Sequence, residues 1–362
     1  MIVASVNYSF DSSTTAFTQA MRELSGESIY TIAGIGNRVS GGPFGVGRCA
    51  QTYPNSGYDY VGFTSDPTTV MLEGWFYDTA TGDGNTIVKA YQTTVLHWYV
   101  QTIPVTGGHL LSVYNGEGEL VAQTTSAYLS SVWHYLALKV YCSDVGSVLM
   151  YVDDVTAPAI NVSGIDVDTR NCAGEYVDPI YGLAAPITHI GWGGSISQHT
   201  TLWADVIVKD TTGAAPHNDL YTSQYRMLPL SPTADGSDTG MTPSAGSDHW
   251  ACVNGQPVSI STHLSTTAAG VRDSSKFTNP SVTGTVLAVV PYQEMSKSDT
   301  ATRKCKTYLR TAAGVFDYSD EITLSTSNLG HSRIELLDPN GNPWTVTSFG
   351  SSGVELGEET TV

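Results

Sequence analysis

The stretch Ser131–Asp154, SVWHYLALKVYCSDVGSVLMYVDD, decides the fold of this chain. Within it, Trp133–Tyr141 alternates two sets of largely apolar or aromatic residues. A period of two with two apolar faces is typical of a strand inside a layered sheet. Ser143–Gly146 then supplies turn residues, and Ser147–Asp153 resumes the alternation. The stretch therefore predicts a β-hairpin in a sandwich.

Short stretches of the same kind recur at near-regular intervals up to about Asp210, separated by Gly, Asp, Asn and Pro. Regular spacing of short strands indicates a sandwich or a barrel, and little helix is expected. The pattern breaks between Thr211 and Asp248, and a second β-rich stretch follows. We therefore predict a β-sandwich over residues 1–212, a linker or packing arm over 213–248, and a β-rich C-terminal domain over 249–362.

The chain is acidic, because its 362 residues include 34 Asp and Glu against 16 Lys and Arg, a formal charge of -18. Such a charge argues against nucleic acid as a partner, since that affinity depends on Lys and Arg neutralising phosphates. No run of about 18 apolar residues is present. The N-terminal MIVASVNYSFDSS also lacks the basic region and apolar core of a signal peptide. We expect a soluble protein that does not insert into a membrane and has no cleaved export signal.

The five cysteines are widely spaced and form no Cys-x-x-Cys pair. Zinc sites and disulfide frameworks both show closer or paired spacing, so neither is expected here. The interpretation is a set of reduced, mostly buried thiols.

Three motifs resemble the concanavalin A-like, laminin G-type jelly-roll family over roughly 200 residues. They are VMLEGWFYD (Val70–Asp78), VWHYLALKVY (Val132–Tyr141) and VLMYVDD (Val148–Asp154). The resemblance implies an all-β chain, in which a concanavalin A-like jelly-roll sandwich is followed by a smaller β-rich C-terminal domain. It implies nothing about the ligand, because one fold hosts many functions.

A second resemblance is to virion proteins of tailed bacteriophages. It covers the opening YSFDSS (Tyr8–Ser13), the junction TPSAGSDHWACVNG (Thr242–Gly255) and the closing LDPNGNPWTVTSFGSSGVELG (Leu337–Gly357). In those proteins a sandwich is commonly joined to a C-terminal β-module. The likeness is one of style and domain order, so it assigns no functional residue.

This second resemblance implies a non-enzymatic virion structural protein, an external appendage of the tail, baseplate or fibre that recognises a host-surface glycan. The expected partners are other virion proteins and copies of this chain, and the expected location is the phage particle, after synthesis in the host cytoplasm. Three alternatives remain open. They are a capsid decoration protein or head fibre, a concanavalin A-like polysaccharide-degrading enzyme, and a free lectin.

The carboxylate pairs of the chain do not predict a glycosidase. Glycoside hydrolysis on this fold uses two carboxylates presented from one strand face, and the chain has no Glu-x-Asp-x-x-Glu. The nearest pairs are Glu117 with Glu119 in a turn, Asp166 with Asp168 in a segment of loop composition, and Asp153 with Asp154. We interpret them as solvated loop charges and predict no catalytic residue.

Four aromatic residues are the candidates for glycan binding, since sugar faces stack on exposed rings. Trp98, Tyr99, Trp192 and Trp203 lie near the ends of predicted strands. The alternative for each is a place in the core, where most large aromatics of a sandwich lie.

The segment DTATGDGNT (Asp78–Thr86) is the candidate metal site. Asp78, Asp83 and Asn85 offer the hard oxygen ligands that Ca²⁺ prefers. Asp-Gly-Asn is also ordinary turn chemistry. No other cofactor is expected.

Overall fold

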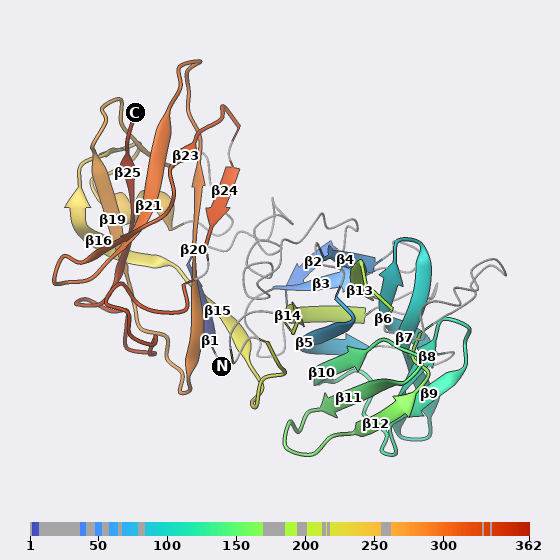
Figure 1. The fold of residues 1–362 in the computed structure, drawn as a ribbon. Helices are drawn as coiled ribbons and strands as arrows, with labels where there is room; N and C mark the ends of the chain where they lie inside the picture. The colour runs from blue at the N-terminus through green and yellow to red at the C-terminus, as the bar shows by residue number, and fades with distance from the viewer. Residues whose placement is uncertain are drawn as a thin grey trace. The chain divides into compact units, whose positions relative to one another are not determined.

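The computed structural model describes residues 2–6, 37–40, 48–52, 58–63, 67–78, 84–168, 185–193, 201–211, 215, 218–254, 262–327, 329–333 and 335–362. The chain is nearly all β, with 52% strand and 2% helix, which confirms the predicted fold class. It divides into two compact units (Figure 1), a jelly-roll unit of residues 21–224 and a C-terminal unit of residues 225–362 with residues 1–20.

The jelly-roll unit is a sandwich of two sheets (Figure 1). In the seven-stranded sheet the order is β12 (Ile160–Ile165), β11 (Gly146–Val152), β10 (Trp133–Tyr141), β5 (Thr69–Asp78), β14 (Thr201–Asp210), β3 (Arg48–Thr52) and β2 (Asn37–Ser40). In the six-stranded sheet the order is β4 (Tyr58–Gly62), β13 (His189–Gly193), β6 (Asn85–Gln92), β7 (Val95–Val105), β8 (Gly108–Asn115) and β9 (Leu120–Gln123).

The hairpin predicted from sequence is confirmed. Strands β10 and β11 pair in antiparallel register from Leu136 opposite Val152 to Tyr141 opposite Ser147. On its other edge β10 pairs with β5, which carries the VMLEGWFYD motif. The three motifs that resemble the jelly-roll family therefore lie on three neighbouring strands at the centre of one sheet.

The core of this unit lies between the two sheets. From the seven-stranded sheet, Leu72 and Leu138 are buried, and the ring of Phe76 lies 5.7 Å from that of Trp203. From the six-stranded sheet, Val100 and Val113 are buried opposite each other. Each large apolar side chain buried in this way contributes about 1.5–3 kcal/mol relative to an exposed one.

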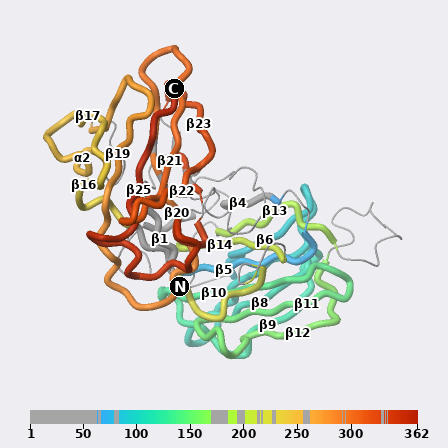
Figure 2. Tube along the Cα trace, turned by 60° about the vertical axis from the view of Figure 1, so that its left-hand side comes forward, coloured from blue at the N-terminus to red at the C-terminus, as the bar shows by residue number. Residues whose placement is uncertain are grey.

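The C-terminal unit is also built of sheets (Figure 2). One has the order β15 (Arg226–Leu230), β1 (Ile2–Val6), β20 (Val286–Met295) and β24 (Leu329–Ser332). The other has the order β16 (Pro232–Thr239), β19 (Arg272–Phe277), β25 (Glu355–Thr360), β21 (Lys304–Arg310) and β22 (Phe316–Tyr318), with β23 (Ile322–Thr323) beside β21. The short strands β17 (Thr242–Pro243) and β18 (Leu264–Ser265) pair, and α2 spans His249–Val253.

A separate apolar core holds the C-terminal unit together. It contains a stacked pair, Trp344 and Phe349, whose ring centroids are 5.6 Å apart, and Phe277 meets Phe349 edge to face. The remaining buried members include Val289 and Leu309. Two cores in one chain agree with the expectation of a sandwich followed by a smaller β-rich domain.

The structure divides the chain differently from the predicted boundaries. Strand β1 pairs in parallel with β15 and β20, so the first strand of the chain belongs to the C-terminal unit. The predicted linker over 213–248 is also divided, because its first part belongs to the jelly-roll unit and β15 to β17 belong to the other. Among the described residues, no helix is long and apolar enough to cross a membrane.

Candidate functional site

The outer face of the six-stranded sheet presents a row of polar and aromatic side chains. Trp98 and Val100 on β7 are fully buried towards the core, so Tyr99 between them points outward. In the register of the sheet, Lys89 on β6 lies opposite Tyr99, and Tyr99 lies opposite Tyr114 on β8. The three residues form one row across three strands, which we call the Lys89 row.

The two tyrosines of the Lys89 row stack on each other. Their ring centroids are 5.1 Å apart and their planes differ by 13°. Both side chains are half-buried, so part of each remains open to a ligand. An offset ring pair of this kind is rigid, because each ring has only two side-chain torsions and packs against the other.

Burial shifts the two titratable groups at the centre of this row. It lowers the pKa of Lys89, since the charged ammonium loses solvation. Burial, and then the nearby Tyr114, raise the pKa of Tyr99. Around neutral pH the Tyr99 hydroxyl therefore keeps its proton and donates it, while the Lys89 amine gives up its proton more readily than an exposed lysine does.

Two further sets of polar groups lie beside the Lys89 row. On one side Gln101 donates from Nε2 to the carbonyl of Gly84 (3.1 Å), and Gln123 Nε2 donates to Ser112 Oγ (2.6 Å). On the other side the ring of Tyr91 stacks on that of His189 (4.9 Å between centroids, 10° between planes). Burial lowers the pKa of His189, which favours the neutral imidazole.

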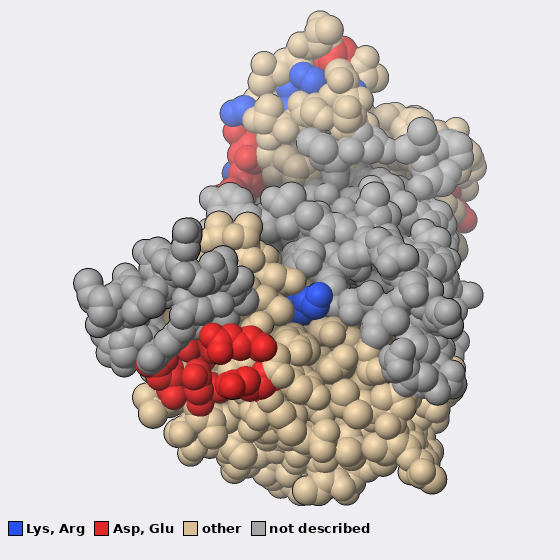
Figure 3. Space-filling model, turned by 90° about the vertical axis from the view of Figure 1, so that its right-hand side faces the viewer, with Lys and Arg blue, Asp and Glu red and all other residues tan. Residues whose placement is uncertain are grey.

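Five of the six strands of this sheet contain no acidic residue in an otherwise acidic protein, and the sixth, β4, contains Asp59. Strands β6, β7, β8, β9 and β13 are fully described and contain no Asp or Glu, although the whole chain has 34. Figure 3 views the molecule from the side on which these strands lie in Figure 1. On the face that it shows, acidic side chains gather in one group beside a largely uncharged surface, at whose edge a basic side chain is visible.

Three of the four predicted glycan-binding residues lie in the core. Trp98, Trp192 and Trp203 are at most 1% exposed, so their ring faces are covered by other core residues and offer no surface to a sugar. The prediction is wrong for these tryptophans, because strand alternation turns each of them inward. Only Tyr99 lies on the outer face, where glycan binding stays a prediction.

The predicted calcium ligands serve the core instead. Asp78 is buried, and its Oδ2 accepts a hydrogen bond from Thr102 Oγ1 (2.7 Å). Asn85 is also buried and donates from Nδ2 to Thr201 Oγ1 (2.7 Å) and to Asp78 Oδ1 (3.3 Å). Asp83 lies outside the described residues. Hydrogen bonds within the sandwich therefore account for the two described members of this set.

Three other carboxylates are close enough to hold a metal ion. One oxygen each from Asp144, Asp166 and Asp168 lies within 4.8 Å of the other two, and we call these residues the acidic cluster. Burial, and then the charge of Asp166, raise the pKa of Asp168 to about 6. From sequence alone, Asp166 and Asp168 are interpreted as loop charges, and Asp144 is not a candidate, because it comes from the turn between β10 and β11.

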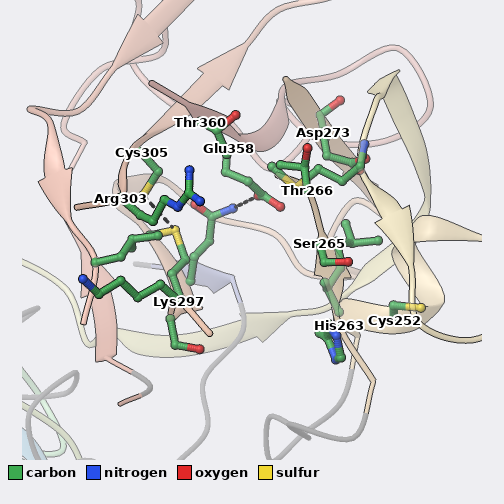
Figure 4. A pocket seen from close by; sticks show the side chains of 18 of the residues that line it. Cys252, His263, Ser265, Thr266, Asp273, Lys297, Arg303, Cys305, Glu358 and Thr360 are labelled. Carbon is green, nitrogen blue, oxygen red and sulfur yellow. Dashed lines mark hydrogen bonds between the residues drawn. The ribbon is translucent and has the colours of Figure 1, made fainter. Parts of the chain in front are cut away.

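The C-terminal unit contains a cavity of about 490 Å³. Figure 4 shows Glu358 pointing into it, between Arg303 and Cys305 on one side and Thr266 on the other. Gln293 Nε2 donates to Glu358 Oε2 (2.5 Å). Burial, and then the charge of Asp273, raise the pKa of Glu358 to about 8. The sequence analysis missed this cavity, since its lining residues come from strands and loops far apart in the chain.

No family model matches the chain, and no curated protein matches it. Solved structures do resemble it. They include an endo-β-1,4-glucuronan lyase from the fungus Trichoderma reesei, at 10% identity and a TM-score of 0.35, over 54% of this chain and 94% of that one. The alginate lyase Aly36B, as a mutant in complex with an alginate trisaccharide, matches at 8% identity and a TM-score of 0.33, over 51% and 93%.

The carbohydrate-binding module CBM66 from Bacillus subtilis also resembles the chain, at 11% identity and a TM-score of 0.30, over 51% of this chain and 98% of that one. At such identities the likeness concerns the fold alone. The expectation of a non-enzymatic virion protein is not retained, since the comparisons support none of its phage and virion terms and the fold is shared with polysaccharide lyases and a carbohydrate-binding module.

Proposed function

We propose that the jelly-roll unit is an enzyme that degrades an acidic polysaccharide, bound along the outer face of the six-stranded sheet. The observation that carries this proposal is the scarcity of acidic residues in these strands. Five strands without Asp or Glu, with Lys89 near their centre, occur in a chain of net charge -18. A polyanion is expected to be repelled less by these strands than by the strongly acidic remainder of the chain.

The side chains of the face suit a uronate chain. Lys89 supplies positive charge, and the amide N–H groups of Gln101 and Gln123 donate hydrogen bonds that a carboxylate or hydroxyl accepts. The stacked rings of Tyr99 and Tyr114 give a rigid aromatic surface at the same place, with two phenolic hydroxyls. The positive charge, the hydrogen-bond donors and the aromatic rings thus lie on four neighbouring strands, β6 to β9.

The residues of this face favour elimination over hydrolysis as the reaction. Hydrolysis of a glycosidic bond commonly needs two carboxylates, and these five strands contribute none. Elimination from a uronate needs a base for the C5 proton and an acid for the leaving oxygen. The C5–H electrons form the C4=C5 double bond, and the C4–O bond breaks as the leaving oxygen takes up a proton.

The Lys89 row can supply both proton transfers. The lowered pKa of Lys89 suits an amine that takes the C5 proton, and the raised pKa of Tyr99 suits a hydroxyl that protonates the leaving oxygen. Gln101 lies two positions from Tyr99 on the same face of β7. We assign to its amide the hydrogen bond that withdraws charge from the uronate carboxylate and acidifies C5–H.

Product analysis tests this proposal. The purified chain is incubated with alginate or β-1,4-glucuronan, and with cellulose as a neutral control, and ultraviolet absorbance and product mass are followed. Elimination predicts unsaturated oligouronates, which absorb through the conjugated C4=C5 bond, and no product from cellulose. Saturable binding without product would instead indicate a carbohydrate-binding unit. The proposal would be refuted if the chain bound no acidic polysaccharide and formed no product from any of them.

A further inference from the structure

The cavity of the C-terminal unit lies where the interior of that unit changes from apolar to polar. Alternate residues of a strand share one face, so Leu356, Glu358 and Thr360 of β25 all point to the interior. Leu356 belongs to the apolar core, and the two polar residues continue its face along the cavity wall. Strand β19 changes in the same way, from Phe277 in the core to Asp273 at the cavity. The interior is therefore filled by apolar side chains at one end and lined by polar groups at the other.

Glu358 lies in the middle of a polar row across three strands. In the register of the sheet it lies opposite Asp273 on β19 and opposite Thr307 on β21. Asp273 Oδ2 is already engaged, since it lies 2.7 Å from His249 Nδ1. Figure 4 shows the Glu358 carboxyl inside the cavity, and among the described residues Gln293 is the one hydrogen-bond donor to it, at Oε2. The other carboxyl oxygen is left to accept from a ligand.

No cation of the described residues neutralises Glu358. Its pKa is set by burial, by the charge of Asp273 and by the hydrogen bond from Gln293, and no Lys or Arg contributes to it. The cations that line the cavity are bound to other groups: Arg303 Nη2 lies 2.7 Å from Asp299 Oδ2, Lys304 Nζ lies 2.6 Å from Glu321 Oε2, and Lys297 Nζ donates to the carbonyl of Ala301 (2.6 Å). A buried carboxyl of this kind is stabilised in its charged form by a cation placed beside it.

We propose that this cavity binds a small primary amine, whose ammonium group pairs with Glu358 and whose apolar part lies against Met295 and Leu324. An ammonium group has three N–H donors and no acceptor, which matches a carboxyl oxygen that has no cation beside it. Both apolar side chains line the same cavity. Its volume of about 490 Å³ lies within the range of about 300–1,000 Å³ that is typical of small-molecule pockets.

This binding site belongs to the C-terminal unit, whereas the enzymatic activity proposed above belongs to the jelly-roll unit. The two proposals rest on different residues, so either one can fail without the other.

Calorimetric titration of the full chain tests the site. Pentylamine and benzylamine are compared with pentanol and benzyl alcohol, which keep the apolar part and replace the ammonium group by a hydroxyl. One amine per chain is expected to bind, and the matching alcohol should bind at least about tenfold more weakly, because a hydrogen bond to a charged group is stronger than a neutral one.

Two variants locate the bound amine. Glu358→Gln keeps an oxygen that accepts from Gln293 and removes the charge in the cavity. Glu359→Gln is the matched control, since its side chain comes from the next position of β25 and pairs with Arg272 on the other face. Affinity for the amine should fall by about tenfold or more in Glu358→Gln and should stay at the wild-type value in Glu359→Gln.

Three results would overturn the proposal. The first is the absence of saturable binding of either amine to the wild type. The second is equal affinity for amine and alcohol, which would indicate an apolar pocket without a role for Glu358. The third is wild-type affinity in Glu358→Gln, which would place the amine elsewhere. Thermal unfolding gives a second readout, because a ligand that binds only the folded chain raises the unfolding temperature, and this rise should be reduced in Glu358→Gln alone.

Discussion

Lys209 Nζ lies 2.6 Å from Glu73 Oε1, and both side chains are completely buried on the side of the seven-stranded sheet away from the six-stranded one. Tyr135 donates its hydroxyl to Glu73 Oε2 (2.8 Å), and the backbone N–H of Tyr221 donates to Glu73 Oε1 (3.2 Å). The Lys209 ammonium also lies 3.5 Å from the centre of the Tyr221 ring. This network fastens the segment around Tyr221 onto the sheet.

Replacing one member of this pair is expected to be severe. Lys209→Met leaves the Glu73 carboxylate buried without its cation, and breaking a buried pair in this way costs about 3–5 kcal/mol. The free energy of unfolding from denaturant titration measures the loss. The double variant Glu73→Leu with Lys209→Met should recover part of it, since no unpaired charge remains. A single variant as stable as the wild type would show that the pair is not ionised.

His134 is expected to make stability depend on pH. Its Nδ1 lies 2.7 Å from Asp153 Oδ2 and its Nε2 lies 2.8 Å from the carbonyl of Leu129, so both nitrogens face acceptors, which favours the protonated ring. Burial opposes the charge, but the hydrogen bonds to Asp153 and Leu129 outweigh it, and the pKa of His134 is raised above 6.5.

A raised histidine pKa stabilises the fold fully below the unfolded value of about 6.5, and this stabilisation is lost as the pH rises through the folded value. The unfolding temperature should therefore fall as the pH rises from about 6.5 through the raised pKa of the folded state. His134→Asn should be less stable at the lower pH and should lack this part of the dependence. An equal fall in the variant and the wild type would assign the pH dependence to other groups.

Glu358 in the C-terminal cavity should also make the fold less stable as the pH rises. The reason here is the burial of its carboxyl group. Burial raises its pKa to about 8, so the folded chain holds a proton that the unfolded chain releases near the ordinary glutamate pKa of 4.5. Stability is then present at acidic pH and is lost as the pH rises towards 8.

Glu358→Gln keeps an oxygen that accepts from Gln293 and removes the charge. We expect the variant to unfold at the wild-type temperature near pH 4 and at a higher temperature than the wild type near pH 8, where the wild type must ionise a buried carboxyl. Thermal unfolding at the two pH values measures the difference. A variant that is less stable than the wild type at both would show that the carboxylate is stabilising.

The fold was predictable because its signals are local. The alternation in Trp133–Tyr141 and the turn at Ser143–Gly146 lie within one stretch of chain, and they predicted the hairpin of β10 and β11. The place of β1 was not predictable in this way, since its partners β15 and β20 follow more than 200 residues later.

The Lys89 row was predictable only in part, because it depends on the register between strands. Tyr99 was a candidate from its residue type, but its neighbours Lys89 and Tyr114 become neighbours only when three strands align. Residue type alone does not distinguish Tyr99 from Trp98, although the side chain of Tyr99 points outward and that of Trp98 points into the core. The acidic cluster likewise needs Asp144 to be brought from another turn.

The most direct test of the proposed function compares the rate of unsaturated product formation from an acidic polysaccharide for four proteins. They are the wild type, Lys89→Met, Tyr99→Phe and the control Lys139→Met, in which the lysine lies on the seven-stranded sheet and pairs with Asp219. Losses of about 100-fold or more are expected for Lys89→Met and Tyr99→Phe, with folding intact, and a wild-type rate is expected for Lys139→Met. Wild-type rates in both Lys89→Met and Tyr99→Phe would contradict the proposed function.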